Sequence, residues 1–375
     1  MHKQARSAGQ ETVNIPAYPR YGGFRVLAIG GGTGLANLLK GLKQYVRTMD
    51  DSISALEPRI TELSAVVTVT DDGGSSGRLR KECNMLPPGD IRNCIAALSE
   101  DEALLSRLFQ HRFQAVSNLN GHSFGNLFLA ALTAITGDFA EAVRQSSEIL
   151  ATRGHIYPST ASDVQLEAVM ADGTRVGGET NITASTGRIK DLHLVPPDVQ
   201  PLPQTLAAIA SADLITIGPG SLFTSLVPNL LVHGIPEAVA ASPAVKVLVC
   251  NLMTEANESL GLSAADHIQV LTNHARTRIL DYALVNATPA SAELKIKYAE
   301  EHASQIVADV DGIEALGVNV ILGDYLEEVD GVARHATDRV SRDLLRLLRH
   351  TFRKEWPERS QTFVDCFGPS STRSC

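Results

Sequence analysis

The sequence predicts an α/β protein in which a mostly parallel, doubly wound sheet carries helices on both faces. Strand-like and helix-like segments alternate through most of the chain, as in successive βαβ units. The strand segments VLAI, LITI and VKVLVC are continuously apolar, which is typical of strands buried on both sides. Because ligands bind at the carboxyl ends of strands in such Rossmann-like sheets, the loops that follow these strands predict one shared site.

The elements follow one another along the chain in a consistent order. Residues 24–46 start as a strand, turn on glycines and continue with leucines at helical spacing. We expect a second strand at Leu63–Thr70 and several helices within 90–150. The stretch VQLEAVMADGTRVGGETNI alternates about a DGT turn and predicts a small β-hairpin, in a β-rich insertion at about 155–200. Further strands are expected in ADLITIGPGSL, VKVLVCNLMTE, LDYALVN and VNVIL, and a final amphipathic helix in DRVSRDLLRLLRHTF.

Length and composition favour a soluble protein. The chain has 375 residues, 44% of them hydrophobic and 20% charged, and no apolar stretch approaches the roughly 18 residues that span a bilayer. We expect one α/β domain at 23–352, a flexible tail at 1–22 and a disordered tail at 353–375. The N-terminus has no apolar signal region, so a cytoplasmic location is expected. We also expect a homo-oligomer, namely a dimer, and no membrane insertion.

Net charge and cysteine spacing argue against a nucleic-acid-binding protein, a disulfide framework and a zinc site. The net charge of −9 disfavours nucleic acid as the main partner, because phosphate backbones attract clustered positive charge. The five cysteines show no CxxC spacing, so neither a disulfide framework nor a zinc site is supported.

The first candidate loop is GGGTGL, between a strand and a helix. Gly31, Gly32, Thr33 and Gly34 would let backbone N–H groups and the positive helix end face an anion such as a phosphate. The motif alone is weak, since it lacks the third glycine of GxGxxG and the Lys-Ser/Thr pair of a P-loop. A tight turn without a ligand is the alternative.

The second candidate loop, DDGGSSGR, joins carboxylates to hydroxyls and an arginine. Asp71 and Asp72 could hydrogen-bond ribose hydroxyls or hold Mg²⁺, a candidate cofactor, although one of the two could simply cap a turn. Arg78 and Arg80 could supply positive charge to a diphosphate, with surface solvation the alternative for Arg80. The neighbouring hydroxyls included in this candidate site are Ser75 and Ser76.

Two predicted helix starts bring further polar residues. In LPPGDIRN, Asp90 is expected to be the N-cap, and Arg92 and Asn93 lie in the first turn. In GHSFGN, His122 and Asn126 stand beside glycines that permit close backbone approach. A lone histidine there is more often a packing or capping residue than a base, and no Ser-His-Asp or Cys-His arrangement can be inferred from the order of residues.

A second glycine loop repeats the first arrangement further along the chain. The stretch IGPGSLFTS places Gly218, Gly220, Ser221 and Thr224 near a helix start, which predicts a second anion site. Two anion sites at one sheet edge suit a diphosphate better than a single phosphate. The polar residues expected after the next strand, where a sugar or base edge could be bound, are Asn251, Thr254 and Glu258.

These motifs, in order and over about residues 24–350, resemble the YvcK family, also called gluconeogenesis factor, which is similar in fold to the CofD 2-phospho-L-lactate transferase. The resemblance implies a CofD-like fold and a cytoplasmic regulator that binds UDP-sugars such as UDP-N-acetylglucosamine. It also implies a role in cell shape and envelope upkeep on gluconeogenic carbon sources, through protein partners in envelope synthesis. By motif, the UDP-sugar would contact Gly31, Gly32, Thr33, Asp71, Asp72, Ser75, Arg78, Asn126, Gly220, Ser221, Asn251 and Thr254.

One departure from the family pattern affects the expected ligand. Leu262 stands at a position that is often aromatic in the family, so a ring that could contact the base or sugar is missing. The main alternative function is a CofD-like, Mg²⁺-dependent transferase that moves a phospholactyl-type group from a nucleotide-diphosphate donor to an acceptor alcohol. An NAD-dependent dehydrogenase, suggested only by the glycine loop and the acid at the strand end, ranks last.

Overall fold

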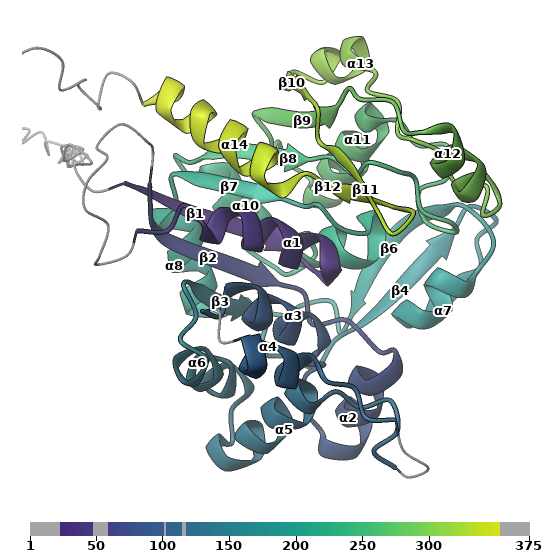
Figure 1. Ribbon diagram of the computed structural model, residues 1–375. Coiled ribbons are helices and arrows are strands. Elements are labelled where there is room, and N and C mark those ends of the chain that lie inside the picture. The colour runs from purple at the N-terminus through teal and green to yellow at the C-terminus, as the bar shows by residue number, and fades with distance from the viewer. Residues whose placement is uncertain (1–22, 48–58, 101–102, 115–117, 353–375) are drawn as a thin grey trace, which may run out of the picture.

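The computed structural model describes residues 23–47, 59–100, 103–114 and 118–352. Within them the chain forms a seven-stranded parallel sheet with helices packed around it (Figure 1). The predicted α/β class and the doubly wound sheet are confirmed. The two tails expected at 1–22 and 353–375 lie outside the described residues.

The main sheet grows in two directions from its first strand. Its strands are β1 (Phe24–Gly30), β2 (Ile60–Val67), β3 (His155–Pro158), β7 (Leu214–Ile217), β8 (Val245–Val249), β9 (Tyr282–Asn286) and β10 (Asn319–Gly323). Their order is β10-β9-β8-β7-β1-β2-β3, and all neighbours are parallel. The chain thus adds β2 and β3 on one side of β1, then returns to add β7 to β10 on the other.

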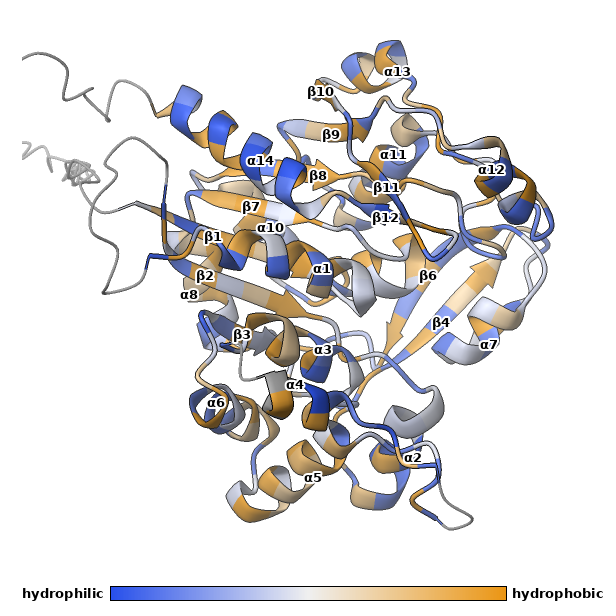
Figure 2. Cartoon of the chain, viewed as in Figure 1, coloured by the Kyte–Doolittle hydropathy of each residue, from blue (hydrophilic) through white to orange (hydrophobic). Residues whose placement is uncertain are grey.

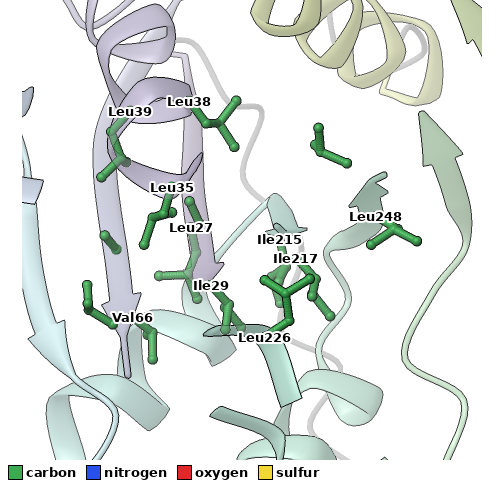
Figure 3. Packing of buried hydrophobic residues seen from close by; sticks show 14 of the residues in the cluster. Leu27, Ile29, Leu35, Leu38, Leu39, Val66, Ile215, Ile217, Leu226 and Leu248 are labelled. Atoms are coloured by element: carbon green, nitrogen blue, oxygen red, sulfur yellow. The ribbon is translucent and has the colours of Figure 1, made fainter. Parts of the chain in front are cut away.

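The centre of the sheet forms the hydrophobic core. Every residue of β7 is buried, and so are all residues of β1 except Arg25. Figure 3 shows Leu27 and Ile29 of β1 close to Leu35 of the first helix and to Ile217 of β7. Burying such a side chain contributes roughly 1.5–3 kcal/mol, so this contact fixes the ends of β1 and β7 side by side.

Two groups of helices cover the sheet. On one face α1, α3 and α14 pack side by side, and α8, which precedes β7, packs with the helices that follow β7 as a second group, consistent with right-handed crossovers in both directions. The first group consists of α1 (Gly32–Lys43), α3 (Gly89–Leu98) and α14 (Thr337–Thr351). The second consists of α8 (Pro203–Ser211), the π-helical turn η1 (Leu222–Leu226), α9 (Val227–Leu230), α10 (Ile235–Ala241), α11 (Ala264–Ala275) and α13 (Val310–Ala315).

A further cluster of helices extends from the sheet in the lower part of Figure 1. It comprises α2 (Gly74–Cys83), α4 (Ala103–Gln110), α5 (Phe124–Thr136) and α6 (Phe139–Ile149). Helices α4, α5 and α6 match the predicted ones, and Figure 2 shows α5 as mostly hydrophobic. Helix α2 was not predicted, because GSSGRLRKEC contains Leu79 as its single large aliphatic residue and shows no helical periodicity.

The β-rich stretch expected at about 155–200 is divided between two sheets. Strand β3 joins the edge of the main sheet beside β2. The predicted hairpin is present and gains a third strand, so that a separate antiparallel sheet has the order β5-β4-β6. Its elements are β4 (Gln165–Met170), β5 (Arg175–Gly177), α7 (Glu179–Ala184) and β6 (Ile189–Val195). The elements near the C-terminus that the sequence did not suggest are α12 (Ala292–Ala299) and the hairpin β11 (Leu326–Val329) and β12 (Val332–His335).

The structure also bears on membrane contact and on the thiols. Among the described residues, no single helix has the length and apolar character to cross a bilayer. The helices Leu222–Leu230 and Ile235–Ala241 meet that criterion only as a pair, which is bent by 76°. In the same part of the chain Cys83, Cys94 and Cys250 are free thiols.

Candidate functional site

The candidate site lies at the carboxyl ends of β1 and β7, where the sheet changes direction. Ile29 near the end of β1 pairs with Ile217, the last residue of β7. After β1 the chain leads to α1 and β2, whereas after β7 it leads to η1, α9 and β8 on the other side. In open α/β sheets this divergence leaves a crevice in which ligands bind.

The two glycine loops contact each other at this crevice. A Cβ added at Gly34 would lie 2.6 Å from the carbonyl oxygen of Pro219, and one at Gly220 would lie 3.3 Å from that of Gly31. Such distances leave room for no side chain at residue 34. The glycines therefore let the two loops approach, and the predicted meeting of distant segments at one sheet edge is confirmed.

Asp71 and Asp72 each bind groups of their own surroundings. Asp71 Oδ1 accepts from the amide of Gly73 at 2.8 Å, which closes a turn. Asp72 Oδ1 accepts from the amide and hydroxyl of Thr180, at 2.9 and 2.6 Å, and so holds the first turn of α7. The capping role that the sequence suggests for one aspartate is thus seen for both. The hydrogen bonds between Asp72 and Thr180 also join the small antiparallel sheet, through α7, to the site.

Asp90 is not the N-cap of α3, as the sequence predicts. Pro88 occupies the cap position, because the helix begins at Gly89. The Asp90 carboxylate lies within the first turn and accepts from the backbone amide of Gly32. Burial raises the pKa of Asp90 to about 6, the Gly32 hydrogen bond opposes this, and the Asp71 carboxylate adds to it. One amide expected to bind phosphate is therefore already bonded to a carboxylate.

The second glycine loop is also occupied by a carboxylate. Glu258, which is 8% exposed, accepts from the amide of Phe223 at 3.1 Å and from the Thr224 hydroxyl at 2.8 Å. Burial, followed by the neighbouring Glu255, raises the pKa of Glu258 to about 7. The Thr224 hydroxyl, which was expected to bind a phosphate, is thus bound to a protein carboxylate together with the Phe223 amide.

The residues after β8 support the same loop. Asn251 exchanges two hydrogen bonds with Gly220, from the Gly220 amide at 3.1 Å and to its carbonyl at 2.8 Å. Thr254 is 2% exposed, and its hydroxyl accepts from the amide of Ser304 at 2.9 Å. Asn251 thus positions the loop, and Thr254 is part of the packing beneath it rather than an open contact.

Glu179, which the sequence did not suggest as a site residue, lies near the carboxylates described above. It is the first residue of α7. Burial raises its pKa to about 9, so it is protonated at neutral pH. The nearby carboxylates that add to this shift are, in order of effect, Asp71, Asp90, Asp72 and Glu258. We call Asp71, Asp90, Glu179 and Glu258 the carboxylate row. The glycine pair before Glu179 is its one signal in the sequence.

The polar residues of α2 and α5 form a hydrogen-bonded network. Ser75 Oγ lies 2.9 Å from Nδ1 of His122 and accepts from Asn126 Nδ2 at 3.0 Å. All three side chains are buried, and Oδ1 of Asn126 has no partner. Burial, followed by Arg78, lowers the pKa of His122, so the ring is neutral at pH 7. The network brings together residues about 50 positions apart, which is why the sequence did not show it.

The arginines of α2 differ in their surroundings. Arg78 donates to the carbonyl oxygens of Asn118 and Asn120. Arg80 is 8% exposed and pairs with Asp163 at 2.6 Å, so the surface position suggested for it is wrong. Ser76 is buried against Gly89, where an added Cβ would lie 2.5 Å from its Oγ.

A large cavity adjoins the carboxylate row. It has a volume of about 930 Å³ and lies between β6 with its preceding turn, the loop at 257–262, and α11. Phe223 and Glu258 are among its lining residues, so it adjoins the second glycine loop, whose Phe223 amide and Thr224 hydroxyl bind Glu258. The remaining lining residues include Arg188, Lys190, Leu262, Gln269, Asn273 and His274. Apart from Glu258 and Leu262, these residues could not be recognised from the sequence as part of a site.

Asp71 and Asp72 do not form a preassembled metal site. Among the described residues, no group of three or more His, Cys, Asp or Glu side chains is arranged to hold a metal ion. Mg²⁺ usually takes one or two protein carboxylates and completes its shell with water and substrate phosphates. A pair of carboxylates such as Asp71 and Asp72 would therefore hold Mg²⁺ only in company with a bound phosphate ligand.

Comparisons with known proteins agree with this architecture. The family model described as 2-phospho-L-lactate transferase CofD matches residues 26–326. The chain is 46% identical to the gluconeogenesis factor of Halalkalibacterium halodurans over 320 residues, 85% of this chain and 95% of that protein. It is 45% identical to the gluconeogenesis factor of Bacillus subtilis over 325 residues, 87% of this chain and 98% of that protein.

A solved structure is similar over nearly the whole described fold. It is the crystal structure of protein BH3568 from Bacillus halodurans, with a TM-score of 0.81 and 46% identity. The match covers 86% of this chain and 100% of that one. A second crystal structure of the same protein, with a TM-score of 0.79, describes it as a member of the UPF0052 family.

Proposed function

The chain belongs to the CofD family and is related within it to the gluconeogenesis factors, and from this premise we propose that it binds a UDP-sugar, UDP-N-acetylglucosamine, as a regulatory ligand. One observation carries the proposal, namely that a cavity of about 930 Å³ adjoins the second glycine loop through Phe223 and Glu258. This volume lies in the usual range of small-ligand sites.

The two ends of the site suit the two ends of such a ligand. The diphosphate would lie at the glycine loops, where the first turn of α1 presents its amides. Uridine or the sugar would extend into the cavity, which offers the amides of Gln269 and Asn273 and the apolar faces of Phe223 and Leu262. Arg188 and Lys190 at the cavity wall bring positive charge to a ligand that must pass near the carboxylate row.

We propose further that ligand binding reports the supply of envelope precursors during gluconeogenic growth. In this role the protein is a cytoplasmic dimer that acts on proteins of envelope synthesis and so maintains cell shape. The relatives named gluconeogenesis factor support the metabolic part of this proposal.

Calorimetric titration with UDP-N-acetylglucosamine tests the proposal. We expect saturable binding by the wild type and about tenfold weaker binding by Lys190→Ala, since a charge-assisted contact contributes roughly 1.5 kcal/mol. Lys295→Ala removes an exposed lysine of α12 outside the cavity and should bind as the wild type does. Absence of saturable binding, or equal loss in both variants, would contradict the proposal.

A second function is favoured by the separated pKa values within the carboxylate row. Asp90, with a pKa of about 6, is ionised at neutral pH, while Glu179, with a pKa of about 9, keeps its proton. Neighbouring carboxyls with separated pKa values are typical of acid–base pairs. In a CofD-like transfer, an acceptor alcohol would give its proton to Asp90 and attack the distal phosphorus of the donor. The bond from that phosphorus to the bridging oxygen would break, and a nucleoside monophosphate would leave.

The transfer reaction has a separate test. Mg²⁺-dependent release of a nucleoside monophosphate from a nucleotide-diphosphate donor would support it, and Asp90→Asn should then reduce the rate at least 100-fold. No release with a panel of donors and acceptor alcohols would leave the regulatory function as the better account.

A further inference from the structure

Three arginines surround the start of α5 without a carboxylate partner. Arg78, Arg92 and Arg112 come from α2, α3 and the segment before α5, and all their hydrogen bonds go to neutral oxygens. Within the described residues none of the three forms an ion pair, whereas Arg80 and Arg144 do. Arg78 and Arg92 are half-buried, and Arg92 feels the charges of Asp90 and Asp71 without forming a direct ion pair with either, which is a costly position for a guanidinium group.

Arg92 is the member of this group most removed from water. A Cβ at Gly125 would lie 2.8 Å from Arg92 Cγ, so the arginine lies directly on the first turn of α5. Its Nη2 donates to Oδ1 of Asn93 at 2.6 Å, and its Nε is buried without a partner. Burial, followed by the charge of Arg112, lowers the pKa of Arg92, so the two guanidinium groups are near enough to repel each other.

The wall beside Arg92 and Arg112 offers groups of both hydrogen-bonding kinds. Nδ1 of His122 is taken up by Ser75 Oγ, which leaves Nε2 as the ring atom that can meet a ligand, as donor or acceptor according to the tautomer. Oδ1 of Asn126, in a residue 2% exposed, is an acceptor without a partner. An anion that also carries a hydroxyl group would satisfy the arginines and Asn126 together.

This region and the cavity adjoin different members of the carboxylate row. Asp90 and Asp71 are the carboxylates that act on Arg92, and Glu258 lines the cavity. Glu179 is close to all three of these carboxylates. Figure 1 shows α5 in the lower part of the molecule and α11 at the upper right.

We propose that Arg92, Arg112 and His122 form a second subsite, which binds the phosphate or carboxylate group of a hydroxyl-bearing small molecule while a nucleotide-sugar occupies the cavity. This deepens the proposed function, since it makes the protein respond to two ligands. Arginine binds planar and tetrahedral oxyanions through paired N–H groups, which fits both anion classes.

The test titrates inorganic phosphate, and in a second arm malate, into protein saturated with UDP-N-acetylglucosamine. We expect at least one of the two to bind without displacing the nucleotide-sugar. Arg112→Gln should weaken that anion at least tenfold and leave the affinity for the nucleotide-sugar within twofold. Arg112 is exposed, so this variant should fold. The control, Arg107→Gln, removes an exposed arginine of α4 and should bind as the wild type does.

Three results would overturn the inference: neither anion binds, the anions compete with the nucleotide-sugar, or Arg112→Gln binds like Arg107→Gln. If UDP-N-acetylglucosamine fails to bind while phosphate or malate binding still depends on Arg112, the proposed function fails and the second subsite stands. The arm with the tighter binding identifies the class of anion.

Discussion

The carboxylate of Glu258 accepts a hydrogen bond of 2.8 Å from the Thr224 hydroxyl, at the place where the sequence predicts a phosphate. Burial and then Glu255 raise its pKa from 4.5 to about 7. Because the folded protein holds this proton more tightly than the unfolded chain, the stabilisation is complete below pH 4.5 and is lost as the pH rises through about 7. We expect the free energy of unfolding to fall across this interval and to level off above it.

Glu258→Gln should remove that part of the pH dependence, because the amide oxygen can still accept from Phe223 and Thr224 and never ionises. At about pH 8 the variant should exceed the wild type by about 3 kcal/mol, and near pH 4.5 the two should agree. Urea unfolding at both pH values measures this. Glu314→Gln, at an exposed position of α13, is the control. A difference that is equal at both pH values would show that Glu258 titrates normally.

The second prediction concerns the contact between the glycine loops. In the interior of a helix such as α1, alanine is favoured over glycine by about 1 kcal/mol, so Gly34→Ala would stabilise an isolated helix. Here the added Cβ would lie 2.6 Å from Pro219 O, and we expect instead a loss of about 1–3 kcal/mol. Nucleotide-sugar binding should weaken with it. Gly177→Ala, where a Cβ meets nothing within 4 Å, should leave both properties unchanged in denaturation and titration.

The strands and glycine loops around the site could be predicted from the sequence, because each is indicated by residues that are neighbours in the chain. Continuous apolar runs show buried strands, and glycines after VLAI and LITI show where the loops must turn closely. Parallel strands place these loops at one edge, so the contact of Gly34 with Pro219 follows from the fold class. The hairpin at β4 and β5 is likewise local, since the DGT turn specifies it.

The partners of the polar groups could not be predicted, because they depend on packing between distant segments. Glu258 reaches a loop 34 residues earlier in the chain, and Asp72 meets Thr180 across 108 residues. Nothing in the composition of these segments indicates which carboxylate fills which loop. Arg80 shows the same problem, since its burial depends on the position of Asp163.

The third prediction contrasts two arginines. Arg80, 8% exposed, pairs with Asp163 and donates to the carbonyl of Val164, whereas the ion pair of Arg175 with Glu167 lies at the surface. Arg80→Ala should lower the free energy of unfolding by about 2 kcal/mol, through lost packing and hydrogen bonds. Arg175→Ala should cost less than about 1 kcal/mol, as exposed pairs do. Chemical denaturation compares the two, and equal costs would mean that the burial of Arg80 contributes little.

The last prediction concerns the cavity. Leu262 is half-buried and lines it, at the position where the family resemblance suggests an aromatic residue. In Leu262→Tyr the ring can extend into the cavity and offer a stacking face to the uracil or the sugar, and such stacking contributes roughly 1–3 kcal/mol. We therefore expect UDP-N-acetylglucosamine to bind about tenfold more tightly in calorimetric titration. Leu316→Tyr adds a ring at an exposed position of the chain after α13 and should have no effect. Unchanged affinity in Leu262→Tyr would mean that the ligand does not reach the 257–262 side of the cavity.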